Sequence, residues 1–461
     1  MSTIKSKPLL LAPLVSIAVF SLFRYYGWGF NPSFTAAITS LCAIWWITEA
    51  IPIPVTALIP LSLFPLVGVL SRKDVTAALG NPIHFLLLGG FILSIAMINS
   101  NAHLRIATGI MQLIKAKNGR HLVWGFMAAS ALLSMWVSNA ATTLMLLPIA
   151  LAILESTKDK QTLRVPLLLG ICYASSIGGM GTPIGTPPNL IFMEIYGQTT
   201  GREISFLDWM KWGVPVILCL LPIVAWKLTR KLTANEAIKI ENRGKWQPAE
   251  TRVLLIFMVT VLLWITRKDP YGGWSEWLGL TGTHDGYIAL IAAILVFIIP
   301  DGKGKPLMNW ELTAKVPWGI ILLIAGGLAL STALKNTGLI GGLTGQLGFI
   351  SGAPSIVLIL IVCFSVTFIT ELMSNSASVA LLLPLLAAVA IAANLDPILL
   401  MLPAALSASC AFMMPMATAP NAIIYGSNRV SIQDMMKQGF GLNLICALIL
   451  ALLVFIMMNS G

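Results

Sequence analysis

The stretch Thr182-Pro183-Ile184-Gly185-Thr186-Pro187-Pro188-Asn189 interrupts an apolar segment with prolines, glycine and hydroxyl side chains. A related stretch in the second half reads Met414-Pro415-Met416-Ala417-Thr418-Ala419-Pro420-Asn421. Proline removes a backbone hydrogen bond and clashes with the preceding turn. Both stretches therefore predict a helix that is broken within a hydrophobic segment.

A second signature precedes each of these breaks, and the two copies lie about 236 residues apart. Ser138-Asn139-Ala140 occurs in the first half and Ser374-Asn375-Ser376 in the second, and a proline follows each Asn after nine residues. Ser and Asn side chains accept hydrogen bonds from free backbone N–H groups and so begin helices well. We expect each signature to form the tip of a re-entrant hairpin, within 122–154 and 354–391.

A third echo pairs Gly89-Gly90, Ser94 and Asn99 with a later Gly-Gly, Ser and Asn. Those later residues are Gly326-Gly327, Ser331 and Asn336. Polar and helix-breaking residues at membrane depth are costly unless they line a cavity that protein encloses. Repeats with matching interrupted segments point to the binding site of a secondary transporter. The sequence therefore predicts that this protein moves a small solute.

Composition excludes a soluble globular chain, because 57% of the 461 residues are hydrophobic and only 10% are charged. Apolar segments recur at about the twenty-residue length that crosses a bilayer. The net charge of +11 comes from loops between these segments, which is better explained by membrane topology than by a nucleic-acid partner. Six single cysteines and four scattered histidines indicate neither disulfides nor a metal cluster.

The predicted fold class is an all-α membrane protein with about eleven transmembrane helices and two re-entrant hairpins, arranged as two inverted repeats. The eleven crossings are expected at 8–27, 33–50, 54–70, 83–100, 163–196, 210–228, 252–265, 285–299, 317–333, 398–425 and 439–458. With a cytoplasmic N-terminus and an outer C-terminus, 21 of the 29 Lys and Arg residues fall on the cytoplasmic side. The positive-inside rule selects this orientation. Residues 104–117 suit an amphipathic helix at the cytoplasmic interface.

The motifs combine groups for an anion with groups for a cation. Helix N-termini at the tips and breaks offer N–H groups and a positive dipole end to an anion. Freed carbonyls with Ser, Thr and Asn oxygens can replace the hydration shell of Na⁺. None of the four motif segments contains Lys, Arg or His, so backbone N–H groups, Asn amides and co-bound cations must compensate a bound anion. Glu371, just before the second tip, could support such a cation from behind.

Other classes of protein fit less well. An intramembrane enzyme needs a nucleophile with a base, or a metal cluster, and the scattered histidines supply neither. A channel is conceivable, but two half-depth hairpins that aim at one midplane favour alternating access. The expected function is transport, without enzymatic activity.

The chain resembles the divalent anion/sodium symporter family, whose members transport dicarboxylates, citrate and sulfate. The resemblance covers nearly the whole chain and rests on the two Ser-Asn tips, on Gly185-Thr186-Pro187-Pro188-Asn189, and on Trp46-Ile47-Thr48-Glu49-Ala50-Ile51-Pro52-Ile53-Pro54-Val55-Thr56-Ala57-Leu58. It implies a homodimer in which a scaffold holds a transport domain that slides as an elevator. Residues 1–120 and 236–350 would be scaffold, and 121–235 and 351–461 would be transport domain.

The resemblance also implies which residues bind. Its first sodium site maps onto Ser134, Ser138, Asn139 and the Gly185 carbonyl. Its second maps onto Thr370, the Met373 carbonyl, Asn375 and the Ala417 carbonyl. The substrate anion would meet Asn139, Ala140, Thr186, Asn375, Ser376 and Thr418.

One position departs from the family pattern. The usual tip is Ser-Asn-Thr in both repeats, whereas this chain has Ala140 and Ser376. Ala140 removes a hydroxyl from the anion site, which leaves the choice of anion open. The resemblance implies sodium-coupled import of a C4 dicarboxylate such as succinate. The alternatives are a sodium-independent anion exchanger, or a symporter for sulfate or citrate, on the same fold. A bacterial-type cytoplasmic membrane is the expected location.

Overall fold

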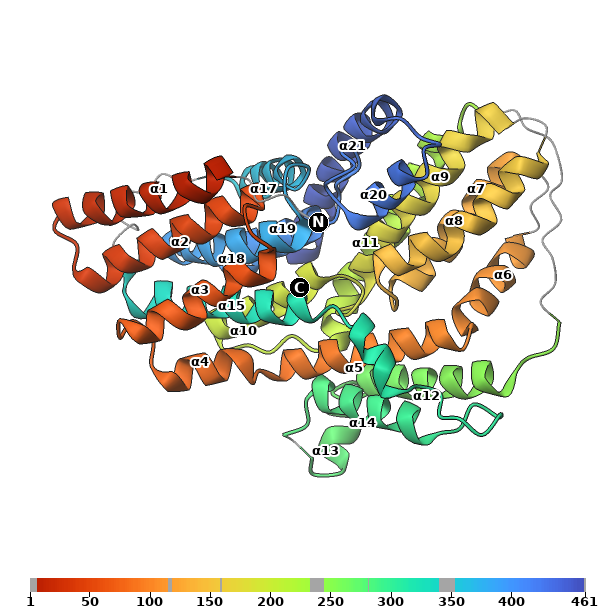
Figure 1. The fold of residues 1–461 in the computed structure, drawn as a ribbon, viewed down its shortest axis with the longest axis horizontal. Helices are drawn as coiled ribbons and strands as arrows, with labels where there is room; N and C mark the ends of the chain where they lie inside the picture. The colour runs from red at the N-terminus through yellow and green to blue at the C-terminus, as the bar shows by residue number, and fades with distance from the viewer. Residues whose placement is uncertain are drawn as a thin grey trace.

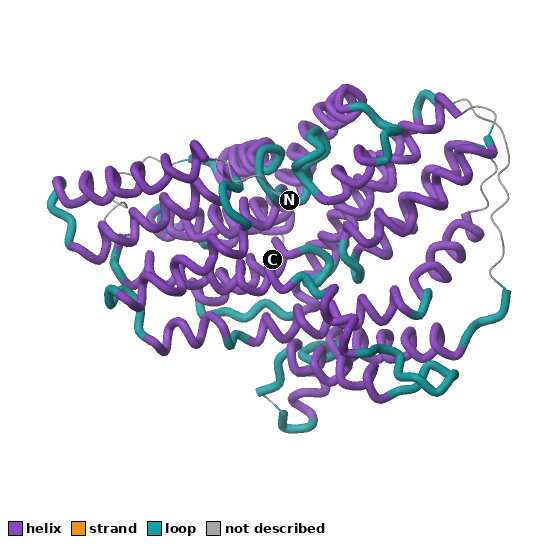
Figure 2. The backbone as a smooth tube through the Cα atoms, in the orientation of Figure 1, coloured by secondary structure: helices purple, strands orange, loops and turns teal. Residues whose placement is uncertain are grey.

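The computed structural model describes residues 6–114, 118–157, 160–232, 244–280, 282–339 and 353–459. The predicted domain boundaries near 235 and 350 lie outside these residues, as does the end of the predicted 104–117 helix. Figure 2 shows that the described residues form helices and connecting loops, with one isolated β-bridge between Pro300 and Pro306. The predicted all-α class is confirmed.

Each half begins with helices that lead up to its hairpin. In the first half these are α1 (Ser6–Tyr25), α2 (Phe30–Thr48), α3 (Ile53–Leu66), α4 (Arg72–Leu79), α5 (Pro82–Asn99) and α6 (Ala102–Ile114). In the second half they are α12 (Pro248–Ile265), α13 (Gly273–Trp277), α14 (Asp285–Ile298), η2 (Trp310–Lys315) and α15 (Trp318–Asn336). The short helices α4 and α13 were not predicted from the sequence.

The rest of each half holds the hairpin, the broken helix and a long final helix. The first half contributes α7 (Gly119–Ser134), α8 (Asn139–Ser156), α9 (Lys160–Gly178), η1 (Gly179–Gly181), α10 (Pro187–Thr200) and α11 (Phe206–Thr229). The second contributes α17 (Ser355–Ile369), α18 (Asn375–Ala392), α19 (Ile398–Ser407), α20 (Ala419–Gly426) and α21 (Ile432–Asn459). Within the described ranges, eight helices are long and apolar enough to cross a membrane. The number of eleven crossings stays a prediction.

Both predicted hairpins form as two helices joined at a Ser-Asn tip. The Ser138 hydroxyl accepts from the Ala141 amide at 3.4 Å, and the Ser374 hydroxyl accepts from the Ala377 amide at 3.3 Å. These bonds satisfy N–H groups that have no partner inside α8 and α18. Serine therefore begins the second helix of each hairpin, as the sequence predicted.

Both predicted breaks also form, and an asparagine holds each of them open. Asn189 Nδ2 donates to the carbonyls of Gly179 and Thr182 at 2.9 and 2.7 Å. Asn421 Nδ2 donates to the carbonyls ten and seven residues before it, at 3.0 and 2.9 Å. The same two spacings in both repeats mean that each amide satisfies carbonyls which the broken helix leaves free.

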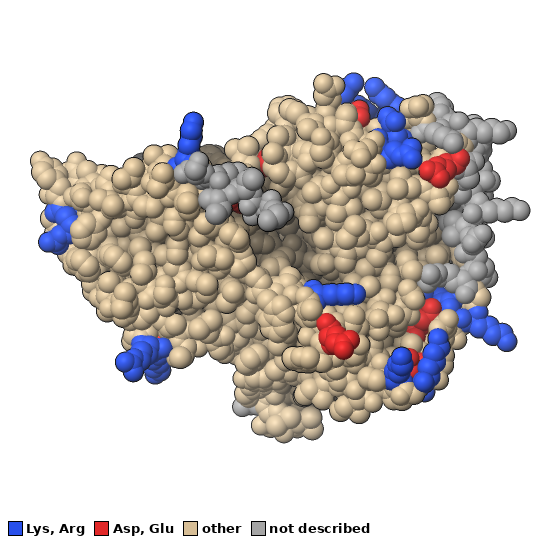
Figure 3. All heavy atoms as spheres, in the orientation of Figure 1, with Lys and Arg blue, Asp and Glu red and all other residues tan. Residues whose placement is uncertain are grey.

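Helices of the first half pack against helices of the second half. Helix α5 packs on α14 of the other half, and α15 packs on α3. In the same way α10 packs on α18 and α20 packs on α8 (Figure 1). Charged side chains are sparse on the face shown in Figure 3, as expected for a surface that meets lipid.

Two glycines allow close contact between helices of different halves, at α5 with α14 and at α15 with α3. A Cβ at Gly89 would lie 2.4 Å from the Ala289 backbone in α14, and one at Gly326 would lie 2.5 Å from the Ala57 carbonyl in α3. Gly89→Ala and Gly326→Ala are each expected to destabilise the protein by about 1–3 kcal/mol through overpacking. The thermal unfolding midpoint of purified protein in detergent measures this. Gly109→Ala is the matched control, because its Cβ would meet nothing within 4 Å, and equal midpoints for all three variants would contradict the close packing.

Candidate functional site

The two hairpin tips and the two helix breaks meet around one cavity of about 220 Å³. Phe91 of α5 and Ile320 of α15 also line it. Its lining contains all six predicted substrate residues, namely Asn139, Ala140, Thr186, Asn375, Ser376 and Thr418. The volume is below the roughly 300–1,000 Å³ that is typical of drug-sized ligands, and so suits a small molecule.

Four helix N-termini converge on this cavity, from α8, α10, α18 and α20. Each presents the positive end of its dipole, although Pro187, Pro188 and Pro420 have no N–H group to offer. No charged side chain occurs among the described residues that line the cavity. Helix dipoles, side-chain amides and hydroxyl groups therefore supply the polarity of the cavity, which favours negative charge.

Hydroxyl groups in the cavity differ in how far they are already used. Thr418 Oγ1 accepts a hydrogen bond from the backbone N–H of Asn421 at 3.2 Å and so caps α20. Thr186 precedes α10 in the same way, but its side chain makes no capping hydrogen bond. The hydroxyl of Thr186 is consequently the one more available to a ligand.

The first predicted cation site appears as a group of oxygens around Asn139. Ser134 Oγ lies 2.6 Å from the end of the Asn139 amide, and the carbonyls of Ser175 and Gly185 lie 3.3 and 3.2 Å from the same atom. The amide satisfies these oxygens when it turns its nitrogen toward them. When it turns its oxygen toward them, four oxygens gather, which is the ligand type that a hard cation such as Na⁺ takes.

The second predicted site repeats this arrangement around Asn375. Thr370 Oγ1 lies 2.8 Å from Asn375 Oδ1 and 3.1 Å from the Ala408 carbonyl. In both repeats the hydroxyl precedes the asparagine by five residues. Two related oxygen groups therefore flank the cavity, one for each half of the chain.

Most of the oxygens around Asn139 and Asn375 come from the C-terminal ends of helices, whereas helix N-termini surround the cavity. Ser134 ends α7 and Ser175 lies in the last turn of α9, whereas Thr370 and Ala408 cap α17 and α19. The negative dipole ends and free carbonyls found there favour cations. Helix polarity thus distinguishes the cavity, at helix N-termini, from the hydroxyls and carbonyls at the ends of α7, α9, α17 and α19.

Three other predicted sodium ligands are placed nearby. Ser138 caps α8 and also lines the cavity, so its hydroxyl has a structural partner already. Met373 is buried in the tip between Thr370 and Asn375. Ala417 lines the cavity at the second break. The role of each as a cation ligand stays a prediction.

Glu371 supports the second break. Its Oε1 accepts from the amides of Phe412 and Met413 at 2.7 and 2.9 Å, and its Oε2 accepts from the amide of Met414 at 2.8 Å. Asn443 Nδ2 donates to Oε1 at 2.6 Å. The buried carboxylate therefore holds the chain between α19 and α20 in place. This is a positioning role, which the sequence indicated only as support for a cation.

Several residues of the site were not predicted from the sequence. The Ser175 and Ala408 carbonyls contribute backbone oxygens, which no residue type reveals. Ser175-Ser176 is a small polar pair before the first break, and this was the one signal that could have found it. Phe91 follows the Gly89-Gly90 echo directly, so that motif marked its position without its role.

Comparison with known proteins identifies the relatives of this chain. The family model described as "Citrate transporter" matches residues 43–400. The sodium-dependent dicarboxylate transporter SdcS of Staphylococcus saprophyticus is 39% identical over 97% of this chain and 90% of its own length. SdcS of Staphylococcus aureus strain NCTC 8325 is 39% identical over 98% and 90%. The chain belongs to the divalent anion/sodium symporter family.

Membership of the divalent anion/sodium symporter family makes the chain a membrane transporter and confirms the expectation that it is not an enzyme. A solved structure, the Alcanivorax borkumensis YdaH transporter, superposes with a TM-score of 0.57. It covers 85% of this chain and 89% of that one at 14% identity. At that identity the likeness concerns the fold alone, and it agrees with the all-helical transporter architecture.

Proposed function

We propose that this protein is a sodium-coupled symporter that imports a C4 dicarboxylate such as succinate. The names of its relatives at 39% identity support this, because both are called sodium-dependent dicarboxylate transporters. The small cavity with four helix N-termini supports an anionic substrate. The two oxygen groups beside it support two cation sites.

One observation carries the proposal: Asn139 and Asn375 each belong to both environments. Each lines the cavity, and each also contacts a hydroxyl at the C-terminus of the preceding helix. A cation that binds an amide oxygen orients that amide, and its nitrogen is then presented to the anion. Sodium would thereby prepare the anion site, which couples the two solutes.

The coupling also answers the electrostatic problem of the substrate. The described lining of the cavity has no charged side chain, and a dianion there is poorly held unless cations lie close to it. Co-transported sodium ions supply that charge. They also supply direction, because inward movement of each net positive charge gains about 2.3 kcal/mol per 100 mV of membrane potential.

The remaining features of the proposal follow the sequence analysis. The hairpins and broken helices, 121–235 and 351–461, would move as one transport domain against a scaffold of 1–120 and 236–350. The protein would be a homodimer in a bacterial-type cytoplasmic membrane, with its N-terminus in the cytoplasm and its C-terminus outside. The motion would be of the elevator type.

Uptake into liposomes tests this function. Purified protein is reconstituted, and labelled succinate uptake is measured with an inward sodium gradient and with sodium replaced by choline. We expect uptake that requires sodium and that unlabelled succinate inhibits. Equal uptake in choline, or counterflow without sodium, would instead establish the sodium-independent exchanger.

The second candidate substrates are citrate and sulfate. The matched family model carries the description "Citrate transporter", and Ala140 leaves space at the tip where the family has threonine. Competition by citrate and sulfate in the same assay separates these substrates from succinate. Stronger inhibition by either one would overturn the C4 assignment while leaving sodium coupling intact.

Ala140→Thr is expected to shift preference toward small dicarboxylates. The new hydroxyl adds a donor to a carboxylate and fills space in the cavity, while sodium is held by neighbouring oxygens. The change is on the order of one hydrogen bond, about 0.5–1.5 kcal/mol, or roughly two- to twelve-fold in relative affinity. Uptake competition among succinate, citrate and sulfate at fixed membrane potential measures it. Unchanged affinities would show that position 140 does not touch the substrate.

A further inference from the structure

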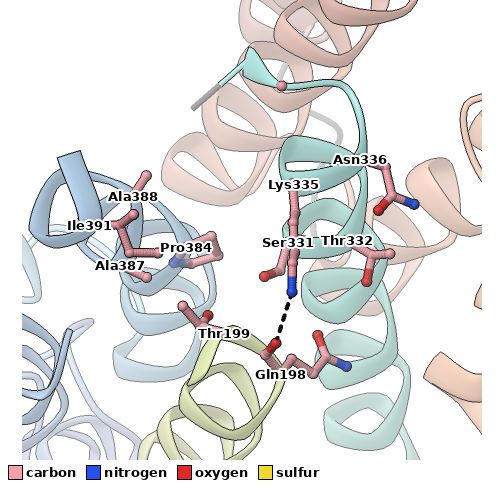
Figure 4. Close-up of a pocket in the computed structure, with 11 residues that line it drawn as sticks. Gln198, Thr199, Ser331, Thr332, Lys335, Asn336, Pro384, Ala387, Ala388 and Ile391 are labelled. Atoms are coloured by element: carbon pink, nitrogen blue, oxygen red, sulfur yellow. Dashed lines mark hydrogen bonds between the residues drawn. The ribbon is translucent and has the colours of Figure 1, made fainter. Parts of the chain in front are cut away.

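A separate cavity of about 600 Å³ lies between α10, α15 and α18. Figure 4 shows α15 presenting Ser331 and Lys335 on one side of it, α18 presenting Pro384 and Ala387 on the other, and α10 ending below. Under the proposed topology these helix ends face the outside of the cell. We name this space the outer vestibule.

Lys335 is the one charged side chain in the described lining of the outer vestibule. Its Nζ lies 3.4 Å from the Gln198 carbonyl, a weak contact that leaves further N–H groups for a ligand. No ion pair of Lys335 occurs among the described residues, and residues 340–352 contain no Asp or Glu. The Ser331 hydroxyl points toward α18 beside it (Figure 4). A positive charge and a hydroxyl therefore share the space with no acidic residue in the described lining.

A smaller cavity of about 190 Å³ is the counterpart at the other end, and we name it the inner vestibule. Its lining includes Ser94 and Asn99, and Ser331 and Asn336 line the outer vestibule 237 residues later. It also contains one lysine, Lys315, and no acidic residue in its described lining. The Gly-Gly, Ser and Asn pattern that occurs in both halves of the sequence thus contributes Ser and Asn residues to both vestibules.

The two vestibules lie differently with respect to the cavity between the hairpin tips and helix breaks, which we call the substrate cavity or central cavity. The inner vestibule shares Phe91 and Ser138 with it, so the two spaces adjoin. The outer vestibule shares none of its described lining residues with the substrate cavity. Between them α15 meets α18, where a Cβ at Gly327 would lie 3.7 Å from the Ala380 Cβ. In this structure the substrate cavity adjoins the inner side.

We propose that each vestibule is an anion-capture site, in which Lys335 on the outer side and Lys315 on the inner side attract the carboxylate substrate before it enters the central cavity. This inference rests on the proposed function for the identity of the anion. The described lining of the central cavity has no charged side chain, whereas the described lining of each vestibule holds one lysine that can attract a free dianion. Walls of low dielectric focus that charge along the entrance.

Side-specific kinetics test the proposal. Lys335→Gln is expected to raise the KM for external succinate about three- to ten-fold, the size expected for a dianion about 8 Å from one charge in water. Maximal rate and the sodium concentration for half-activation should not change, and Lys335→Arg should restore the KM. Lys315→Gln is the matched control: it should leave external KM unaltered and raise the KM for efflux from the lumen.

A lysine in the last turn of α15 also interacts favourably with the helix dipole, so a structural role must be separated from capture. A structural loss lowers the maximal rate in both directions and is not restored by Arg. That result, or an unchanged external KM in Lys335→Gln, would overturn the proposal. An equal change of KM at both faces in either variant would overturn it too.

A second measurement does not depend on transport. Ala388 lines the outer vestibule, and among the cysteines only Cys219 is not buried. In a Cys219→Ser background, Ala388→Cys is modified with an anionic and a cationic methanethiosulfonate. Lys335→Gln should lower the ratio of anionic to cationic rates about three- to ten-fold, on the same electrostatic grounds. If Lys335→Gln leaves the ratio of modification rates unchanged, anion capture is contradicted, whether or not the wild-type protein transports succinate. If the ratio changes but the wild-type protein takes up no succinate, only the proposed function is contradicted.

Discussion

Asn139→Ala and Asn375→Ala are each expected to abolish sodium-dependent uptake while the protein still inserts into the membrane. Each amide lines the cavity proposed for the anion and contacts the hydroxyl of a proposed cation site. Alanine therefore removes one ligand for a cation and one for the anion together. Hydrogen bonds to charged groups contribute about 1.5–3 kcal/mol each, so losing two reduces transport by on the order of a hundred-fold or more. Uptake of labelled succinate by purified, reconstituted variants measures this.

Asn394→Gly provides the control for this pair. Asn394 is exposed after α18 and has a φ of 57°, a conformation that glycine adopts readily. Its replacement should leave uptake and folding unchanged. Near-normal sodium-dependent uptake by either Asn139→Ala or Asn375→Ala would remove the foundation of the site assignment.

Glu371→Ala is expected to unfold the second break and to eliminate transport. Three backbone amides and the Asn443 side chain donate to this carboxylate. A buried donor without a partner costs about 1–3 kcal/mol, so the loss of all four bonds destabilises the protein by about 3 kcal/mol or more. Glu371→Gln keeps one acceptor oxygen and should be intermediate. Thermal unfolding in detergent, with and without sodium, measures the order of the three proteins.

Glu155→Gln is the matched control for the loss of an acidic side chain. Glu155 pairs with Arg429 at 3.4 Å, and both side chains are more than half exposed. Exposed ion pairs contribute little, so this variant should unfold with wild-type protein. An unfolding midpoint of Glu371→Ala that equals the wild-type value would mean that the carboxylate does not hold the break.

Local features of the site could be predicted because they depend on neighbouring residues only. Proline at 187 and 188 cannot continue a helix from the preceding segment, and Ser138 and Ser374 cap the helices that follow them. Repetition of both signatures in the second half doubled the evidence for each. The tips, the breaks and the six cavity residues followed from these patterns together with the family resemblance.

Backbone contributions to the site could not be predicted. The carbonyls of Ser175 and Ala408 reach the oxygen groups because α9 and α19 end beside the hairpins, and any residue type carries a carbonyl. Glu371 was expected to serve a cation, yet its oxygens face three amides of the second break. Which of two possible partners a buried carboxylate finds depends on where a distant loop passes.

The sequence by itself determined where each helix is interrupted, which residue begins the next one, and that the chain consists of two related halves. Those properties arise from proline geometry, from side-chain capping and from hydrophobic length, all of which act over a few residues. Only the tertiary structure decided which helices of the two halves pack together, such as α10 on α18 and α20 on α8. Apolar helix faces are chemically alike, so composition cannot choose among them. The choice depends on close backbone approach, such as that of Gly89 to Ala289, which exists only once both helices are in place.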